Sequence, residues 1–160
     1  QTTILPHAGQ TLGLGMIQLD IVNPSGQLPA DSGEQKVETE VTDAESNAYS
    51  IVSLISFGKF KALLTGDMPP DISDRLAAEN AVGQVNYIKI PHHGSKNGLT
   101  LNLLKALEPK LAVISVGKNL YGHPAGEILK MLTDEGIKYL RTDQTGDIEV
   151  TTDGNSFRIK

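Results

Sequence analysis

The alternation of apolar and polar positions predicts short strands near the start of the chain. Residues 16–22, MIQLDIV, alternate with a period of two, as a strand with one buried face does, and Pro24 closes the run. Residues 49–67 predict two more strands that fold back on each other around Gly58-Lys59. Residues 25–48 are polar, acidic and glycine-containing. We expect them to form a long surface loop that is mobile at least in part.

After residue 67, helical and extended patterns alternate. Helices are predicted over residues 68–81, 99–109 and 124–137, and strands over residues 85–90 and 110–117 and within 138–160. We expect Asp71 or a neighbour to cap the first helix, and Thr100 or Asn97 the second. The run KLAVISVG at residues 110–117 is almost continuously apolar, as in a strand covered on both faces. This order of elements predicts the α/β class.

Composition narrows what such a fold could do. With 160 residues and 16 glycines, we expect a single turn-rich unit spanning residues 1–160. The chain contains no cysteine, which leaves histidine, carboxylate and water as metal ligands. The formal charge of −5 argues against a protein that coats nucleic acid. No apolar run approaches the roughly 18 residues of a membrane-spanning helix and no leader pattern is present, so we expect a cytoplasmic chain or one that has lost its leader.

Three consecutive predicted strands end in residues that can carry chemistry. The first ends at Asp67, the second at His92 and His93, and the third leads to His123. If these strands are parallel neighbours, their carboxyl ends share the sheet edge where α/β proteins bind ligands. Imidazole and carboxylate together suit Zn²⁺, Mn²⁺ or iron.

Each of these residues also has a purely structural interpretation. Asp67 could be an ordinary turn residue or helix cap. Adjacent histidines are commonly one solvated and one hydrogen-bonded side chain, and His123 could be a loop residue fixed by the proline after it. His7 lies in a small turn without a partner motif, and we interpret it as structural. The agreement of three strand ends under one topology favours a site.

Three segments carry a resemblance to a known family. LLTGD, IKIPHHGSKN and AVISVGKNLYGHP, in this order and at these intervals, closely resemble the later half of the metallo-β-lactamase-fold hydrolase domain of ComEC-type competence (DNA-uptake) proteins and their stand-alone relatives. HHGS followed by SVG and YGHP is specific to that branch, whereas TGD belongs to the superfamily at large. The resemblance covers essentially the whole chain. It implies an αββα sandwich, represented here by its second half, a mixed sheet with helices.

The resemblance also implies roles for the residues at the strand ends. Asp67 would bridge two divalent metal ions, Zn or Mn, and His123 would be a terminal ligand of one of them. Of His92 and His93, one, taken as His92, would be a metal ligand, and the other would contact or protonate a phosphate. The implied chemistry is metal-assisted hydrolysis, in which the metals activate a water and stabilise charge on the substrate.

The same resemblance implies a class of substrate. Ser95 and Lys96, ahead of a predicted helix, would offer donors and positive charge to an anionic group. The implied activity is that of a phosphodiesterase or nuclease acting on DNA or another phosphate ester, in a bacterial extracytoplasmic or secreted protein. The acidic net charge weakens the nucleic-acid case. The alternatives are a non-catalytic interaction module that keeps half of the fold, and a generic α/β ligand-binding domain whose histidines are incidental.

One departure from the family is large. The signature HxHxDH, which supplies most metal ligands in the superfamily, is absent, and the chain contains no His-x-His at all. The first half of the sandwich was therefore removed, lies on another chain, or is naturally absent, and the intact later motifs favour removal. We expect this piece alone to be inactive, with no metal necessarily bound. We also expect it to bind the missing half or to self-associate through an uncovered sheet face.

Overall fold

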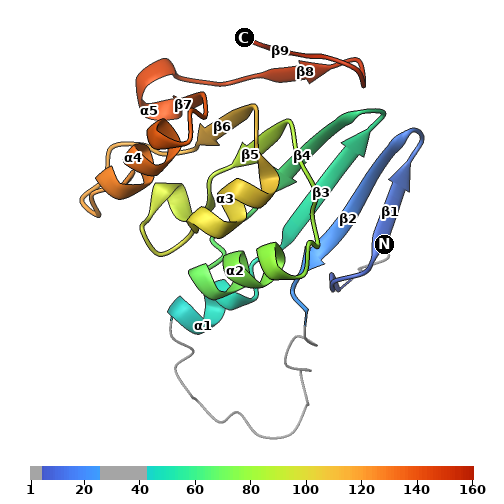
Figure 1. Cartoon of the computed structure of the whole chain (residues 1–160), viewed down its shortest axis with the longest axis horizontal. Helices are drawn as coiled ribbons and strands as arrows, with labels where there is room; N and C mark the ends of the chain where they lie inside the picture. Colours follow the sequence, from blue (N-terminus) through green and yellow to red (C-terminus); the bar gives the residue numbers. More distant parts are fainter. Residues whose placement is uncertain (1–4, 26–42) are drawn as a thin grey trace, which may run out of the picture.

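The computed structural model describes residues 5–25 and 43–160, which form a seven-stranded mixed sheet with helices (Figure 1). The strands lie in the sheet in the same order as in the chain. They are β1 (Thr11–Leu14), β2 (Ile17–Asn23), β3 (Val52–Phe57), β4 (Phe60–Leu64), β5 (Tyr87–Lys89), β6 (Leu111–Ile114) and β7 (Tyr139–Arg141). The predicted mixed α/β sheet is confirmed.

Strands β1 to β4 form an antiparallel meander, as the period-two patterns predict. The β3–β4 hairpin turns at Gly58-Lys59, with Phe57 paired to Phe60. Gly58 has a φ of 58°, and a Cβ there would lie 2.7 Å from the Gly154 carbonyl oxygen. Glycine is therefore required at this turn both by backbone conformation and by the approach of the C-terminal hairpin.

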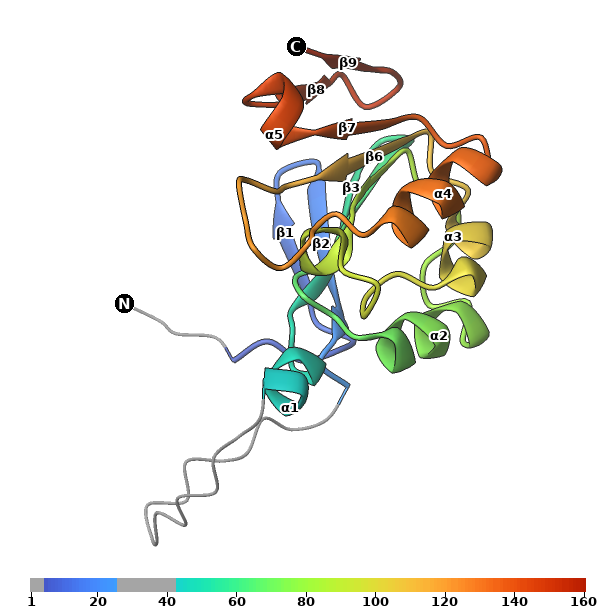
Figure 2. The same ribbon diagram turned by 90° about the vertical axis from the view of Figure 1, so that its left-hand side faces the viewer.

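Strands β4 to β7 run parallel, and helices connect them. The connecting helices are α2 (Pro70–Ala78), α3 (Leu101–Leu107) and α4 (Gly126–Asp134). All three cover the same face of the sheet (Figure 2). Thr100 caps α3 by accepting the Leu103 N–H, as predicted. The prediction for α2 is wrong, because its N-cap is Pro69 without a side-chain cap, and Asp71 lies inside the first turn.

The main core lies between this sheet face and the helices. The sheet contributes Val52, Leu54, Leu63, Ile88, Ala112 and Ile114, and the helices contribute Leu76, Leu103, Leu104, Leu107, Ile128 and Leu132. Ile90, directly after β5, adds to the same core. All four residues of β6 are buried, as its apolar sequence predicts. Burying each leucine or isoleucine contributes roughly 1.5–3 kcal/mol, so this layer stabilises most of the parallel half.

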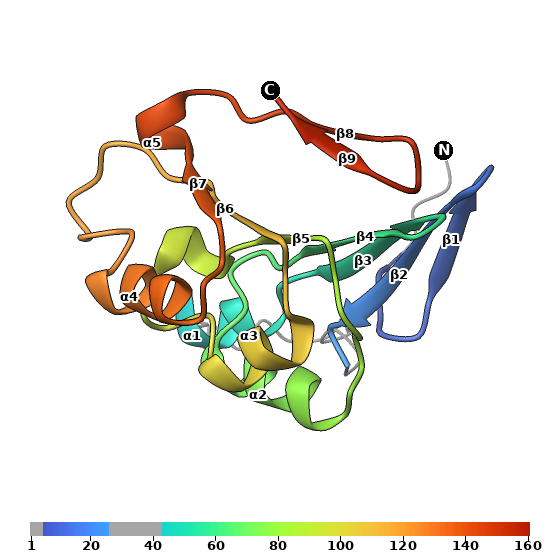
Figure 3. The same cartoon turned by 45° about the horizontal axis from the view of Figure 1, so that its top comes forward.

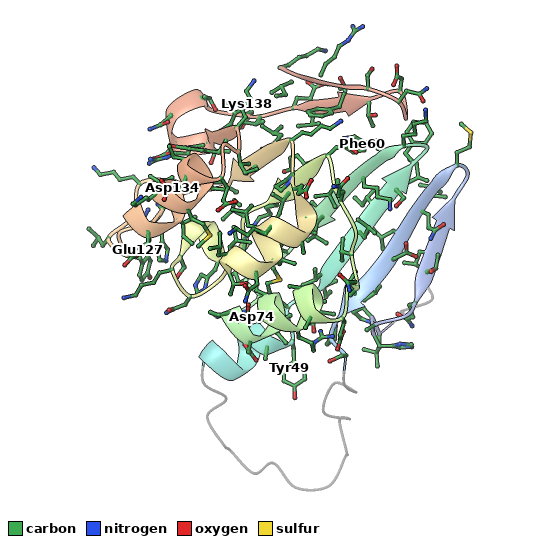
Figure 4. The ribbon with its side chains drawn as sticks, viewed as in Figure 1. Tyr49, Phe60, Asp74, Glu127, Asp134 and Lys138 are labelled. Carbon is green, nitrogen blue, oxygen red and sulfur yellow. The ribbon has the colours of Figure 1, made fainter. Side chains whose placement is uncertain are left out.

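The opposite face of the sheet is covered by a small separate hairpin. Strands β8 (Val150–Thr152) and β9 (Phe157–Ile159) form this hairpin, which follows a short helix, α5 (Thr142–Thr145). Figure 3 shows the hairpin and the helices on opposite sides of the sheet. Phe60 packs against Phe157 with ring centroids 5.8 Å apart, and Figure 4 shows Phe60 next to β8–β9. The cover is partial, because Leu14 on β1 remains 78% exposed.

Two expectations concern parts of the chain outside the main sheet. Of the predicted loop at residues 25–48, residues 26–42 lie outside the described residues, and the last six form helix α1 (Asp43–Ala48). The predicted terminal strands are found, but β8 and β9 form their own sheet, and the short helix α5 separates them from β7. Within the described ranges, every helix is too short or too polar to cross a membrane.

Candidate functional site

The four predicted residues at the strand ends meet at one edge of the sheet. β4 leads to Asp67, β5 to His92 and His93, and β6 to His123, and the three strands are parallel neighbours. The loops after β5 and β6 lie side by side in Figures 1 and 3. His93 Nε2 lies 4.0 Å from Asp67 Oδ1, and the rings of His92 and His123 are 5.7 Å apart. The predicted common edge is thus present.

Backbone contacts hold Asp67 in place at the end of β4. Gly66 precedes it with a φ of 55° and turns the chain sharply. Ser50 Oγ accepts the Asp67 N–H at 3.2 Å, and Thr65 Oγ1 donates to the Lys89 carbonyl at 2.7 Å. The carboxylate itself is 40% exposed. Asp67 is therefore fixed through its main chain and keeps its side chain available.

The two histidines occupy an unusual turn. His92 and His93 both have left-handed backbone, with φ of 49° and 55°. Such a conformation costs a non-glycine residue about 1–2 kcal/mol and persists only where surrounding contacts enforce it. Here the His92 N–H donates to the Gly66 carbonyl, and the Ser95 N–H donates to the His92 carbonyl at 2.8 Å. The turn points consecutive imidazoles toward the same edge.

The hydrogen bonding of His93 determines its tautomer. Its Nδ1 lies 2.7 Å from the Ser115 carbonyl oxygen. A carbonyl oxygen can only accept, so Nδ1 carries the proton. Nε2 is then the free nitrogen of the ring, and it lies on the Asp67 side. Carbonyl contacts of this kind also orient histidines that bind metals in proteins.

Asn119 organises the loop that carries His123. Its Nδ2 donates to the carbonyls of Gly117 and His123, both at 2.9 Å. Its Oδ1 accepts the N–H groups of Tyr121 and His123. Tyr121 stacks on the His123 ring at 6.0 Å with an interplanar angle of 24°. The half-buried amide of Asn119 thereby holds the loop through four hydrogen bonds.

The loops after β5 and β6 touch at a glycine. Gly94 has a φ of 81°, and a Cβ there would lie 2.6 Å from Pro124 Cβ and 3.3 Å from Ile114 Cγ2. The Gly94 carbonyl accepts the Ala125 N–H at 2.9 Å. Only glycine allows this approach, which brings His92 and His123 together.

Burial and repulsion from the neighbouring histidines favour the neutral form of His123. Burial lowers the pKa of His123, and the neighbouring His92 and His93 lower it further. Burial also lowers the pKa of Lys89, while the Asp67 carboxylate opposes that shift. Neutral histidine with a lone pair is the form that binds a metal ion.

The donor chemistry fits divalent metal ions, but the ligand set is incomplete. His92 Nδ1 and His123 Nδ1 are buried and have no hydrogen-bond partner among the described residues. Imidazole nitrogens without a partner suit Zn²⁺, Mn²⁺ or iron. Residues 5–25 and 43–160 nevertheless contain no group of three or more His, Asp or Glu side chains arranged to hold a metal ion. The described residues alone therefore offer no complete metal site.

The remaining predicted residues are placed as follows. Ser95 is only 4% exposed, and its Oγ accepts the Asn97 N–H, so the hydroxyl is engaged in a local turn. Lys96 is exposed. Both precede α3 by several residues, and Thr100 occupies its N-terminus. His7 is exposed and contacts its own turn through the Ala8 carbonyl, consistent with the structural interpretation.

Sequence reasoning missed three residues that shape this edge. Asn119 and Tyr121 lie inside the quoted AVISVGKNLYGHP segment, but nothing in their spacing indicates an amide that holds the loop or a ring that stacks on His123. Ser50 lies 17 residues before Asp67, and only the β3–β4 hairpin brings the two together. An asparagine or serine flanking a strand end is the signal that could have suggested them.

Comparison with curated proteins finds relatives among competence proteins. ComE operon protein 3 of Bacillus subtilis is 30% identical over 142 residues, which cover 88% of this chain and 16% of that protein. Competence protein ComA of Neisseria gonorrhoeae is 31% identical over 115 residues, and Recombination protein 2 of Haemophilus influenzae is 32% identical over 111 residues. Each match covers 69% of this chain, and 16% and 14% of the respective relative. The chain thus spans about a sixth of the length of these relatives. No family model matches it.

Solved structures with the metallo-β-lactamase fold resemble this chain. CmlA, a diiron β-hydroxylase from Streptomyces venezuelae, superposes with a TM-score of 0.54 at 16% identity, over 85% of this chain and 32% of that one. A structure named as a metal-dependent hydrolase from Parabacteroides distasonis superposes with a TM-score of 0.50 at 14% identity, over 84% of this chain and 55% of that one. The predicted fold class is confirmed.

Proposed function

We propose that this chain carries one wall of a metal-dependent phosphodiesterase centre. The premise is that the chain has the metallo-β-lactamase fold and belongs to the family of ComEC-type competence proteins, to one segment of which it is related in sequence. The supporting observation is the convergence of Asp67, His93 and the orphaned nitrogens of His92 and His123 at one sheet edge. The other wall, with the remaining ligands, would come from the missing first half of the sandwich.

Each residue would have a definite task at this centre. Asp67, His123 and His92 would hold the metal ions, because they offer one carboxylate and two unpartnered imidazole nitrogens. The bound ions would supply an activated water and neutralise charge on the phosphoryl oxygens. His93, oriented by the Ser115 carbonyl, would present Nε2 to the substrate. After taking up a proton from solvent at Nε2, it would give that proton to the leaving oxygen and return to the neutral form. Lys96 would attract the anionic substrate from the rim.

The substrate that best matches this proposed centre is a phosphodiester. The competence-protein relatives support a DNA-related role in a bacterial protein. Because the net charge is −5, phosphates would have to be bound by local cationic side chains and by the metal ions. A short or single phosphodiester therefore fits this centre better than a long duplex.

The test is hydrolysis of bis(p-nitrophenyl) phosphate with Mn²⁺ or Zn²⁺, by this chain combined with a first half that carries HxHxDH. Asp67→Asn should lower the rate by more than about 100-fold, the scale on which metal-site substitutions act. Asp134→Asn is the matched control, because Asp134 is exposed and is the last residue of α4, at the end of that helix far from the His123 loop. Asp67→Asn should also weaken Zn²⁺ binding in calorimetry. Unchanged hydrolysis and unchanged Zn²⁺ binding would remove Asp67 from the centre.

A second candidate, a non-catalytic interaction module, is favoured by the apolar strands on the open sheet face. Leu12, Leu14 and Ile17 are all more than 40% exposed there. Exposed apolar side chains that adjoin one another on a sheet are typical of an interface. If the combined halves bind each other but neither hold metal nor hydrolyse the phosphodiester, this second function is the correct one.

A further inference from the structure

Leu120 and Tyr121 form the most exposed apolar pair of the described chain. Leu120 is 103% exposed and Tyr121 is 85% exposed, at the tip of the loop between β6 and α4. Isolated exposed apolar residues are normal, but two adjacent ones beside a candidate site call for a ligand or partner. The loop is therefore a candidate contact surface.

Asn119 holds the backbone at Tyr121, and the Tyr121 ring lies against His123. The Tyr121 backbone N–H donates to Asn119 Oδ1 at 3.0 Å, and its ring stacks on His123. The Asn119 side chain also bonds the backbone N–H and the carbonyl of His123, so the backbone of residues 119–123 is restrained. With one face against His123 and 85% of the residue exposed, the other face of the ring is open.

The position of this ring relative to the candidate centre limits what it can bind. The Tyr121 ring stacks directly on the His123 ring, and the ring centroids of His123 and His92 are 5.7 Å apart. Lys96 and Lys118 are exposed and belong to the same two loops, after β5 and β6, so both loops carry positive charge. An open aromatic face beside cations is how proteins bind single-stranded nucleic acid, since every unpaired base offers a flat surface for stacking.

We infer that Tyr121 stacks on an unpaired base of the substrate and so holds the adjoining phosphodiester over the site. This inference rests on the proposed function, and it narrows the substrate to single-stranded nucleic acid or a nucleotide ester. A duplex would have to open at this point, because paired and stacked bases have no free face. Tyr121 then contacts the substrate through its aromatic ring.

The experiment measures binding, so that it is independent of hydrolysis. The full chain is titrated with a short end-labelled single-stranded oligodeoxynucleotide and with an abasic chain of the same length and charge, by fluorescence anisotropy without added metal. Tyr121→Leu should weaken binding of the base-containing probe by about five- to a hundredfold, the range for losing one base stack. Binding of the abasic probe should not change.

Two control variants separate the ring from its surroundings. Tyr121→Phe keeps the aromatic face and should bind both probes within about twofold of the parent chain, since stacking needs only the ring. Leu14→Ala removes an exposed leucine on β1, at the end of the sheet away from this loop, and should also bind within about twofold. Circular dichroism melts should show that all three variants are folded.

Several results would overturn the inference. These are equal binding of the base-containing probe by the parent chain and Tyr121→Leu, equal loss for both probes, and no binding of either probe by the parent chain. A change in oligomeric state of Tyr121→Leu with unchanged probe binding would make the ring a protein contact and would also overturn it. If the ring dependence is found but the combined halves hydrolyse no phosphodiester, the proposed function fails and the stacking role stands.

Discussion

The two faces of the seven-stranded sheet have the same apolar character but unequal cover. On the face under α2, α3 and α4, Leu63, Ile88 and Ile114 are completely buried. On the other face, β8–β9 covers Phe60, while Leu14 at the β1 end is 78% exposed. Strands with apolar residues on both sides are built for burial on both sides. This chain therefore covers one face of its sheet completely with helices and the other face only in part, with the β8–β9 hairpin.

The strongest test compares two neighbouring leucines on opposite faces of β4. Leu63→Ala should lower the free energy of unfolding by about 3 kcal/mol, because it opens a cavity in the helix-covered core. Leu64→Ala should cost about 1 kcal/mol, because Leu64 is only half-buried and lines an open groove of about 280 Å³. Urea unfolding of both variants measures the difference.

Protein concentration is the control for this pair. If the open face is covered by a second copy of the chain in solution, Leu64→Ala will cost as much as Leu63→Ala at high concentration and less on dilution. Equal costs at every concentration would contradict the unequal cover of the two faces.

A second test concerns the close contact between the loops after β5 and β6, at the sheet edge that carries the candidate site. Gly94→Ala should lower the free energy of unfolding by about 2 kcal/mol, because the added Cβ meets Pro124 and Ile114 at a φ of 81°. Gly117→Ala is the control, since a Cβ there meets nothing within 4 Å, and it should change stability by less than about 0.5 kcal/mol. Thermal melts of both variants measure this, and similar values would show that the two loops can separate freely.

A third test concerns the partial cover on the open face. Phe157→Ala should cost about 1–2 kcal/mol, less than a fully buried phenylalanine, because Phe157 is half-buried against Phe60. Hydrogen exchange should then speed up at Lys59 and Phe60, whose N–H groups donate to the Gly154 carbonyl. Unchanged exchange at these two amides would mean that the hairpin is held by other contacts.

The smallest effect on stability is expected at the bare end of the open face. Leu14→Lys should change the free energy of unfolding by less than about 0.5 kcal/mol, because Leu14 is mostly exposed. It should nevertheless reduce self-association, which light scattering measures, because it interrupts the apolar surface. Leu120→Lys is the control for an exposed leucine away from this face. A parent chain that is already a monodisperse monomer would refute the expected association.

The sequence predicted the local features and the common edge, and it missed what depends on distant contacts. The Gly58-Lys59 hairpin and the Thr100 cap follow from neighbouring residues, so they could be read directly. Asp67 and His123 could be placed on one edge because parallel strands align their carboxyl ends.

The missed features share a physical cause. Ser95 was expected to face a substrate, but tertiary packing buries it. Asp71 suits a cap by residue type, but Pro69 occupies that position in the fold. The contact between Arg75 and buried Asn23 joins residues 52 positions apart, which no local pattern encodes.

The strictly sequential strand order has a consequence for how the chain assembles. Each strand from β1 to β7 pairs with the strand that follows it in the chain, so the sheet can grow stepwise from the β3–β4 hairpin without threading. The hairpin closes quickly, whereas each parallel addition must wait for a helical crossover. We therefore expect the edge that carries the histidines to form late, because β6 must dock before His123 can approach His92.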